Sequence, residues 1–322
     1  MNTPSLPNEE IASSVVAAMT GEQVLSVSRM PTGDQNFVFA VKTTDTEYVI
    51  RMTDVDHKQK FVAAVCWQQM LLPLGVPLAE FIKTDLDGTY SLFPALLMKR
   101  LLGDDLVNVY PNLTDSDKRD LASAIIEIQD LTKTMPEGPG FGITDSYEHA
   151  HEFKTWYEFL MQRLNLFKDH VTKNKVFDPE KITKVITVAE SMKEELSSIP
   201  ASPFLWDASE RNVLVHNGKI TGIVDVDELC FGDPLFVIAL TSAALELEGL
   251  DTVYTDYWEE MLHLDMKAQQ RLAFYRLFYA AAFMRKHSIQ TANNKKVMFN
   301  TERLENIYQQ AMMRVNTYAK IK

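Results

Sequence analysis

The spacing of hydrophobic residues changes near Gly103, and this change constrains the fold more than any other feature of the chain. Before it, short runs such as "FVFAV" and "EYVIRM" alternate with turn-forming residues such as "KTTDT", a pattern that predicts antiparallel strands. After it, apolar residues recur at helical spacing through most of the sequence. We therefore predict an α+β fold with two lobes, a small antiparallel β-rich lobe followed by a larger, mostly helical one.

The expected helices follow from the same spacing. One begins after the capping residue Asn8 and ends at Gly21, and a second covers residues 58–72. The helices expected in the second lobe cover residues 116–132, 152–171, 179–198, 235–247, 266–287 and 301–318. We place the first, nucleotide-binding lobe at residues 1–98, a hinge at 99–103, and the helical catalytic and acceptor-binding lobe at 104–322.

The composition excludes several classes of protein. Of 322 residues, 46% are hydrophobic, enough for an extensive core. The net charge is −12, whereas nucleic-acid binding needs a basic face, so we expect no nucleic-acid partner. Cys66 and Cys230 are too few for a disulfide framework or a zinc site. Glutamates stand where a signal peptide would be basic, and Arg271 and Arg276 interrupt the most apolar late segment, so we expect a cytoplasmic protein without a membrane segment.

One β-hairpin carries polar residues that suggest a site. The segment "NVLVHNGKITGIVDVDE" contains Asn217-Gly218, a pair favoured in two-residue turns. If these two residues form the loop, Asn212 lies opposite Ile223, and side chains alternate between the two faces of the hairpin. One face is expected to hold Asn212, Ile223, Asp225 and Asp227, and the other, towards the core, Val213, Val215, Ile220 and Val224.

The polar face of this hairpin predicts a magnesium site. Asn212 and Asp225 would be diagonal neighbours with Cα atoms about 7–8 Å apart, and oxygen ligands at such positions can converge on one Mg²⁺. Asp207 precedes Asn212 in the loop that leads into the hairpin. We predict that Asp207 accepts or orients the proton of an attacking hydroxyl, while Asn212 and Asp225 hold the metal on the phosphates of a nucleotide.

The motifs around the hairpin resemble those of the aminoglycoside phosphotransferase and choline-kinase family of small-molecule kinases, which are relatives of the protein kinases. The matching stretches are "LWDASERNVLV", "GIVDVDE", "FGDP", "TGDQNFVFAV", "YVIRM", "GVPLAEFI" and "PALLMKRLLGDDL". They extend over about residues 29–242. The resemblance implies a bilobal protein-kinase-like fold. It also implies transfer of the γ-phosphate of ATP or GTP, with Mg²⁺, to a hydroxyl of a small molecule.

The resemblance also assigns roles to residues outside the hairpin. It implies that Arg51 holds the α- and β-phosphates, a role that suits a guanidinium. It implies that Asp233 is structural and caps the helix that follows it. The loop residues implied to close over the phosphates are Gly33, Asp34, Gln35 and Asn36, and those implied to contact the purine are Met98, Lys99 and Leu101.

The chain departs from the family pattern in its catalytic loop. Leu205 stands where the family usually has His, and Trp206 stands at a Gly position. The family's His braces the loop through hydrogen bonds and transfers no proton, so its replacement leaves the chemistry in place.

A second departure concerns the first long helix. In the family this helix presents a Glu to the phosphate-binding Lys or Arg, but here "KQKFVAAVCWQQML" has no acidic residue, and the expected position falls near Ala64. Gln68, Gln69 or an acidic residue elsewhere are the alternative partners of Arg51.

The sequence leaves the acceptor open. Asp227 and Glu228 are candidate substrate-binding residues, and Glu246, Glu248 and Asp251 add further acidity. This acidity is consistent with a cationic acceptor, such as an aminoglycoside or an aminoalcohol, and equally with an exposed helix face; sugar acceptors also fit. The choice between ATP and GTP and the oligomeric state are open as well.

Two other functions fit parts of the sequence. The loss of the usual His and Glu fits a catalytically weak, nucleotide-binding regulator. The segment "IVDVDE" ends an apolar strand in Asp-x-Asp, which also fits a metal-dependent glycosyltransferase. The strand-helix alternation expected of such a transferase is missing upstream.

Overall fold

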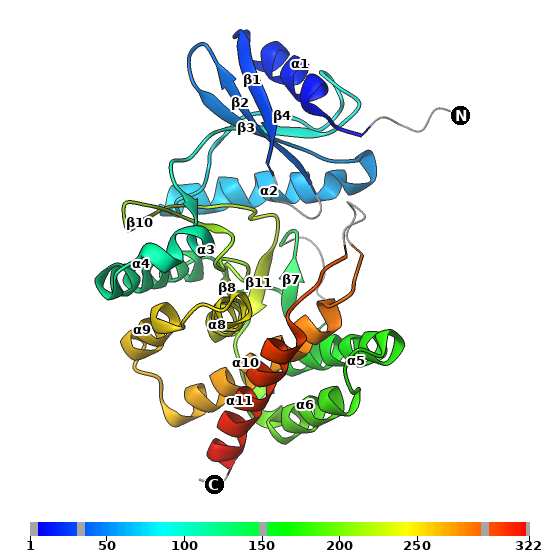
Figure 1. Ribbon diagram of the computed structural model, residues 1–322, viewed down its shortest axis with the longest axis vertical. Coiled ribbons are helices and arrows are strands. Elements are labelled where there is room, and N and C mark those ends of the chain that lie inside the picture. The colour runs from blue at the N-terminus through cyan, green and yellow to red at the C-terminus, as the bar shows by residue number, and fades with distance from the viewer. Residues whose placement is uncertain (1–5, 31–35, 148–152, 291–295, 320–322) are drawn as a thin grey trace.

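One five-stranded antiparallel sheet contains the strands of the first hundred residues, in the order β1-β2-β3-β5-β4. The computed structural model describes residues 6–30, 36–147, 153–290 and 296–319. Figure 1 shows this sheet at the top of the view, with α2 between it and the helices below. The elements of this part are α1 Glu9–Thr20, β1 Val24–Arg29, β2 Phe37–Thr43, β3 Glu47–Met52, η1 Val55–His57, α2 Lys58–Leu71, η2 Leu72–Leu74, β4 Phe81–Asp85 and β5 Ala95–Lys99.

Helices α1 and α2 cover opposite faces of the sheet. Side chains alternate along β5. Ala95 and Leu97 therefore pack with α1, while Leu96 and Met98 pack with α2. Helix α1 begins and ends as predicted, because the Asn8 side chain accepts a hydrogen bond from the amide of Ile11 at 2.9 Å and Gly21 adopts a left-handed conformation.

The second part of the chain is helical and has its own core. The helix α10 is at its centre and packs against α5, α6, α8 and α11. Its inward side chains are buried, as expected for its apolar sequence. Within the described residues, no helix combines the length and apolarity that a membrane crossing requires. The helices are α3 Leu106–Val109, η3 Tyr110–Asn112, α4 Asp115–Lys133, α5 Trp156–Asn174, α6 Glu180–Ser191, α7 Lys193–Ser197, α8 Leu235–Glu248, α9 Val253–Met261, α10 Met266–Lys286 and α11 Thr301–Ala319.

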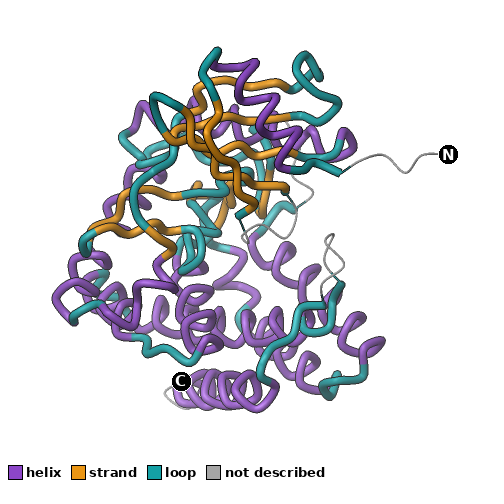
Figure 2. Tube along the Cα trace, turned by 45° about the horizontal axis from the view of Figure 1, so that its top comes forward, coloured by secondary structure: helices purple, strands orange, loops and turns teal. Residues whose placement is uncertain are grey.

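The predicted fold class is confirmed: an antiparallel sheet precedes a mainly helical part (Figure 2). Two details of the prediction are wrong. The helix expected over residues 179–198 is interrupted at Met192, and the short helix α9 was not expected. The exact lobe and hinge boundaries remain a prediction.

Two small sheets lie in the second part, with strand orders β10-β9-β6 and β7-β11-β8. Strand β6 directly follows the predicted hinge and pairs with β9, and the Thr221 hydroxyl donates to the carbonyl of Leu102 at 2.5 Å. The hairpin is thus tied to the segment between the two parts. The strands are β6 Asp104–Asp105, β7 Gly142–Thr144, β8 Ser202–Phe204, β9 Val213–His216, β10 Lys219–Ile223 and β11 Leu229–Gly232.

The hairpin forms as predicted at its turn, but its register is different at its open end. Ile220 lies opposite Val215, as expected, but a bulge then shifts the pairing, so that Ile223 lies opposite Val213. The prediction that Ile223 faces Asn212 is therefore wrong, and Ile223 is buried in the core. Gly222 marks the irregularity because a Cβ there would lie 2.3 Å from the Leu101 side chain.

Candidate active site

The loop that carries Asp207 connects β8 to β9, and a glutamine from a distant helix holds it. The Gln129 amide nitrogen donates to the Leu205 carbonyl at 3.0 Å, and the Leu205 amide donates to the Gln129 side-chain oxygen at 3.0 Å. Both residues are buried. Gln129 therefore braces the loop in the place where the family pattern would use a His at position 205. This contact was not predicted, because 76 positions of sequence separate the two residues.

Asp207 and Asn212 are adjacent, as predicted. The Asn212 side-chain nitrogen donates to the Asp207 carbonyl at 2.9 Å, which turns the loop back towards the hairpin. Burial, together with the charges of Asp225 and Glu210, raises the pKa of the Asp207 carboxyl to about 7, against the opposing charge of Lys286. A carboxyl with a pKa near neutrality is suited to take a proton from a hydroxyl.

Arg51 lies at the same place and is held by two aspartates. Its terminal nitrogens donate to both carboxylate oxygens of Asp227, at 2.9 and 2.7 Å, and one of them also donates to Asp225 at 2.7 Å. Burial alone would lower the pKa of Arg51, but the charges of Asp227 and Asp225 outweigh it and raise the pKa. Strand β3 and the end of the hairpin are thereby joined across 174 and 176 positions of sequence.

The partner of Arg51 comes from none of the positions on α2. One of the two glutamines considered there, Gln68, has other partners. Its amide nitrogen donates to the carbonyl of Ala79 at 2.6 Å, and its side-chain oxygen accepts from the amide of Phe81 at 3.1 Å. It therefore ties α2 to the segment that enters β4. The third alternative, an acidic residue elsewhere in the chain, is the one that the geometry supports.

Two side chains at the end of the hairpin can hold a metal. Asn212 uses its amide nitrogen within the loop, which leaves its side-chain oxygen without a donor among the described residues. Asp225 adopts a left-handed backbone conformation with φ of 61°, and its side chain is 49% exposed. Within the described part of the chain, no three His, Cys, Asp or Glu side chains come together as a metal site. Two ligands suit a magnesium ion that takes its remaining oxygens from phosphates and water.

The described residues of the predicted nucleotide loop and hinge lie just before β2, at the end of β5 and just after it. Asn36 is buried, and its carbonyl accepts from Arg29 at 3.5 Å. Met98 is buried between β5 and α2, Lys99 is exposed, and Leu101 contacts Gly222 of the hairpin. The predicted loop residues Gly33, Asp34 and Gln35 lie outside the described residues.

The acidic residues considered for the acceptor are not gathered in one place. Glu248 pairs with Arg211, and Asp251 pairs with Lys118 at 2.8 Å. Burial raises the pKa of Glu246, which lies near Arg276 of α10 and Arg314 of α11. Glu228 lies closer to the candidate site than these three residues, because it directly follows Asp227 in the sequence. Burial raises the pKa of Glu228 as well.

Asp233 has the structural contacts that its sequence position implied. One carboxylate oxygen accepts from the amide of Leu235, at the start of α8, at 3.1 Å. The other accepts from Arg271 at 2.7 Å and from the Tyr275 hydroxyl at 2.9 Å. This carboxylate therefore joins α8 to α10.

Helix α10 also brings residues towards Asp207 that the sequence analysis did not identify. The charge of Lys286, at the end of this helix, lowers the pKa of Asp207. Tyr279 is buried, and its hydroxyl has no hydrogen-bond partner among the described residues. Burial raises the pKa of Tyr279, and the charges of Cys230 and Asp207 add to the shift. The surroundings of Asp207 are therefore of mixed polarity.

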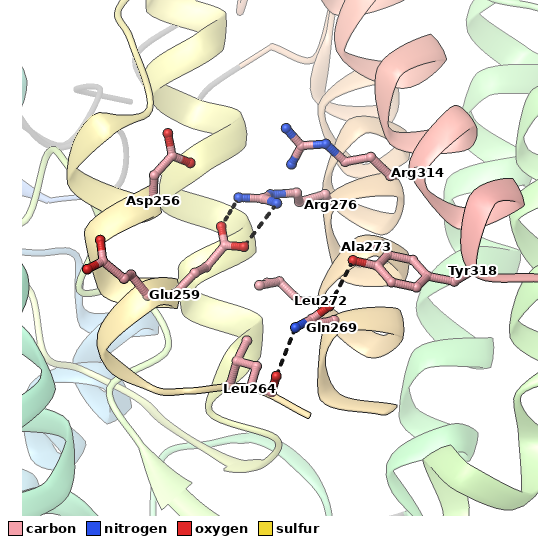
Figure 3. A pocket seen from close by; sticks show the side chains of 10 residues that line it. Asp256, Glu259, Leu264, Gln269, Leu272, Ala273, Arg276, Arg314 and Tyr318 are labelled. Atoms are coloured by element: carbon pink, nitrogen blue, oxygen red, sulfur yellow. Dashed lines mark hydrogen bonds and ion pairs between the residues drawn. The ribbon is translucent and has the colours of Figure 1, made fainter. Parts of the chain in front are cut away.

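A cavity of about 490 Å³ lies elsewhere, between α9, α10 and α11 (Figure 3). Figure 3 shows Arg276 paired with Glu259, and Tyr318 bonded to Gln269 at 3.2 Å. None of the predicted site residues lines this cavity. Its charged side chains contribute nothing to the arrangement around Asp207.

The sequence matches one family model over most of its length. The model describes the phosphotransferase enzyme family and matches residues 27–275. No curated protein matches the chain.

Solved structures share the fold at low sequence identity. A thermostable mutant of aminoglycoside phosphotransferase APH(4)-Ia, in a ternary complex with AMP-PNP and hygromycin B, is 17% identical with a TM-score of 0.64, over 96% of this chain and 97% of that one. A protein from Haemophilus somnus 129PT named as a fructosamine-3-kinase is 14% identical with a TM-score of 0.63, over 94% and 96%. A mutant of aminoglycoside 2'-phosphotransferase-IIIa in complex with GDP is 13% identical with a TM-score of 0.63, over 98% and 96%.

Proposed function

The chain belongs to the phosphotransferase enzyme family, and on this premise we propose that it transfers the γ-phosphate of ATP or GTP to a hydroxyl group of a small molecule. The reaction is an in-line transfer in which positioning and charge stabilisation supply most of the catalysis. The observation that carries the proposal is the convergence of Asp207, Asn212, Asp225 and Arg51 from three separate parts of the chain.

Each of these side chains has a role that its chemistry suits. Asp207 orients the acceptor hydroxyl and takes its proton, and its pKa of about 7 leaves a large share of it ionised at neutral pH. Arg51 binds phosphate oxygens through its planar guanidinium. The oxygens of Asn212 and Asp225 would hold Mg²⁺, and a bound Mg²⁺ would supply positive charge to the phosphate oxygens.

The charges around Asp207 bear on the acceptor. Of the acidic residues considered for a cationic acceptor, Glu248 and Asp251 form ion pairs with Arg211 and Lys118. Glu246 and Glu228 also lie near basic side chains. Lys286 adds a positive charge on the side of α10. These basic side chains do not favour a cationic acceptor.

A transfer assay tests the proposal. The protein is incubated with Mg²⁺-ATP or Mg²⁺-GTP and a panel of acceptors: aminoglycosides such as hygromycin B, fructosamines, aminoalcohols and neutral sugars. We expect acceptor-dependent release of nucleoside diphosphate. Asp207→Asn is expected to lose at least about a hundredfold in kcat, because general-base catalysis commonly contributes that much, and to bind nucleotide normally.

Two further variants complete this test. Asp225→Asn is expected to lose metal-dependent nucleotide binding, because one of two protein oxygens loses its charge. Asp130→Asn, at an exposed position of α4, is the control and is expected to keep full activity. Full activity of both Asp207→Asn and Asp225→Asn would show that the site is assigned wrongly.

The two alternative functions predict other outcomes of the same assay. A regulator binds Mg²⁺-nucleotide without any acceptor-dependent turnover. A glycosyltransferase of the Asp-x-Asp type needs both carboxylates at the metal, whereas both oxygens of Asp227 accept hydrogen bonds from Arg51. The contacts of Asp227 therefore do not support the glycosyltransferase function.

A further inference from the structure

The contact between Arg51 and Asp227 is a two-pronged ion pair shielded from water. Two guanidinium nitrogens meet two carboxylate oxygens, at 2.9 and 2.7 Å, and the two side chains are 9% and 11% exposed. Such paired bonds fix the plane of the guanidinium as well as its position. Phe61 lies against Arg51, with its ring centroid 5.3 Å from the guanidinium carbon, and limits movement further.

This geometry argues against the other roles available to Asp227. A metal ligand or a substrate-binding carboxylate needs an oxygen that faces the bound group. Both oxygens of Asp227 face Arg51, and the residue is 8% exposed. Asp225 differs on each point, because its side chain is 49% exposed and one oxygen accepts from Arg51.

Helix α2, which lies against Arg51 on another side, offers no carboxylate. Residues of α2 pack on this face of the sheet, including Phe61 and Ala64. Helix α2, Lys58–Leu71, contains neither Asp nor Glu. A buried guanidinium without an anion is strongly unfavourable, and among the described residues the hairpin side supplies that anion.

We propose that Asp227 is the positioning residue of this enzyme, which holds Arg51 in place for the nucleotide phosphates and replaces the missing carboxylate of α2. The inference rests on the proposed function. It also separates the two aspartates. If Asp225 bound a metal ion instead of Arg51, Asp227 would still hold the guanidinium through its two hydrogen bonds.

A double-mutant cycle tests whether Asp227 acts through Arg51. The variants are Asp227→Asn, Arg51→Met and the two together, and the measured quantities are the dissociation constant of Mg²⁺-nucleotide and kcat/KM. Hydrogen bonds between charged groups are commonly worth enough for about a tenfold or larger effect. We expect Asp227→Asn to weaken nucleotide binding by about that factor, while the same substitution in the Arg51→Met protein changes it less than about twofold.

Two controls separate positioning from folding. Asp251→Asn removes a carboxylate from another ion pair with a buried cation, Lys118, and is expected to leave nucleotide binding unchanged. If Asp227→Asn does not fold, the cycle is run with Asp227→Glu and Arg51→Lys. Each of these substitutions is expected to weaken nucleotide binding. The double variant is expected to bind no more weakly than the weaker-binding single variant.

The outcomes also distinguish this inference from the proposed function. The inference would be overturned if Asp227→Asn weakened nucleotide binding as much in the Arg51→Met protein as in the wild type. Asp227 would then contact nucleotide, metal or acceptor directly. Non-additive effects on nucleotide binding, without turnover for any acceptor, would support the inference and overturn the proposed transfer. A protein that binds no Mg²⁺-nucleotide would overturn both.

Discussion

Glu210 is a buried carboxyl without a role in the proposed chemistry, and its neutralisation is expected to stabilise the protein at high pH. The residue is 4% exposed, and one of its carboxylate oxygens has no hydrogen-bond partner among the described residues. Burial raises its pKa from an ordinary value of 4.5 to about 7, against partial compensation by backbone amides and Arg211. We therefore expect Glu210→Gln to remove an unfavourable charge.

The expected size follows from this difference in pKa. Glu210 binds its proton more tightly in the folded than in the unfolded chain, so the free energy of unfolding falls as pH rises from about 4.5 and levels off above about 7. At 1.36 kcal/mol for each pH unit, the full difference is about 3 kcal/mol. Relative to wild type, Glu210→Gln is thus expected to be about 3 kcal/mol more favourable at about pH 8.5 than at about pH 4.5.

Urea unfolding at these two pH values measures the effect. The slope of the unfolding free energy against urea is expected to stay the same, because the change exposes no additional surface. Glu127→Gln, at an exposed position of α4, serves as the control and should show no such dependence on pH. An equal effect of Glu210→Gln at both pH values would refute the reasoning, because the ionised carboxylate would then be as well solvated in the folded protein as in water.

Two further predictions concern the catalytic loop. The charge of Glu210 raises the pKa of Asp207 and that of Lys286 lowers it, so the acid limb of the profile of kcat/KM against pH is expected to move to lower pH in Glu210→Gln and to higher pH in Lys286→Gln. Shifts in the same direction would contradict this. Gln129→Leu leaves the buried Leu205 amide without its partner and the Leu205 carbonyl with only the Ala208 amide, at 3.4 Å. This is expected to cost about 2 kcal/mol of stability and to lower kcat, with chemical unfolding and initial rates as the measurements. An unchanged kcat in this variant would show that the brace does not position Asp207.

The fold class could be predicted because it depends on patterns that are local in sequence. Alternating runs and the Asn217-Gly218 turn indicated strands, and capping residues such as Asn8 indicated helix ends. The register at the open end of the hairpin was wrong because a bulge depends on a contact with Leu101, more than a hundred positions away. Gly222, inside a strand, was the available sign of that bulge.

The candidate site divides in the same way. Asp207 and Asn212 were predicted to be adjacent because their spacing within one loop is short, and the structure joins them by a hydrogen bond. The alternation of side chains along a strand does not apply to Asp225 and Asp227, because β10 ends at Ile223 and both aspartates follow it in a loop. Their contacts depend on Arg51, which belongs to another sheet.

The two departures from the family pattern are compensated by different kinds of interaction, and this difference has a physical reason. The loop that carries Asp207 has Leu205 where the family pattern has a His, and Gln129 supplies a neutral donor and a neutral acceptor to the backbone of Leu205. Arg51 carries a charge that burial makes unfavourable, so a neutral glutamine could not replace a carboxylate. Asp227 supplies that charge from 176 positions away. A missing motif residue is therefore weak evidence against activity when the structure provides a group of the same charge and hydrogen-bonding capacity at the same place.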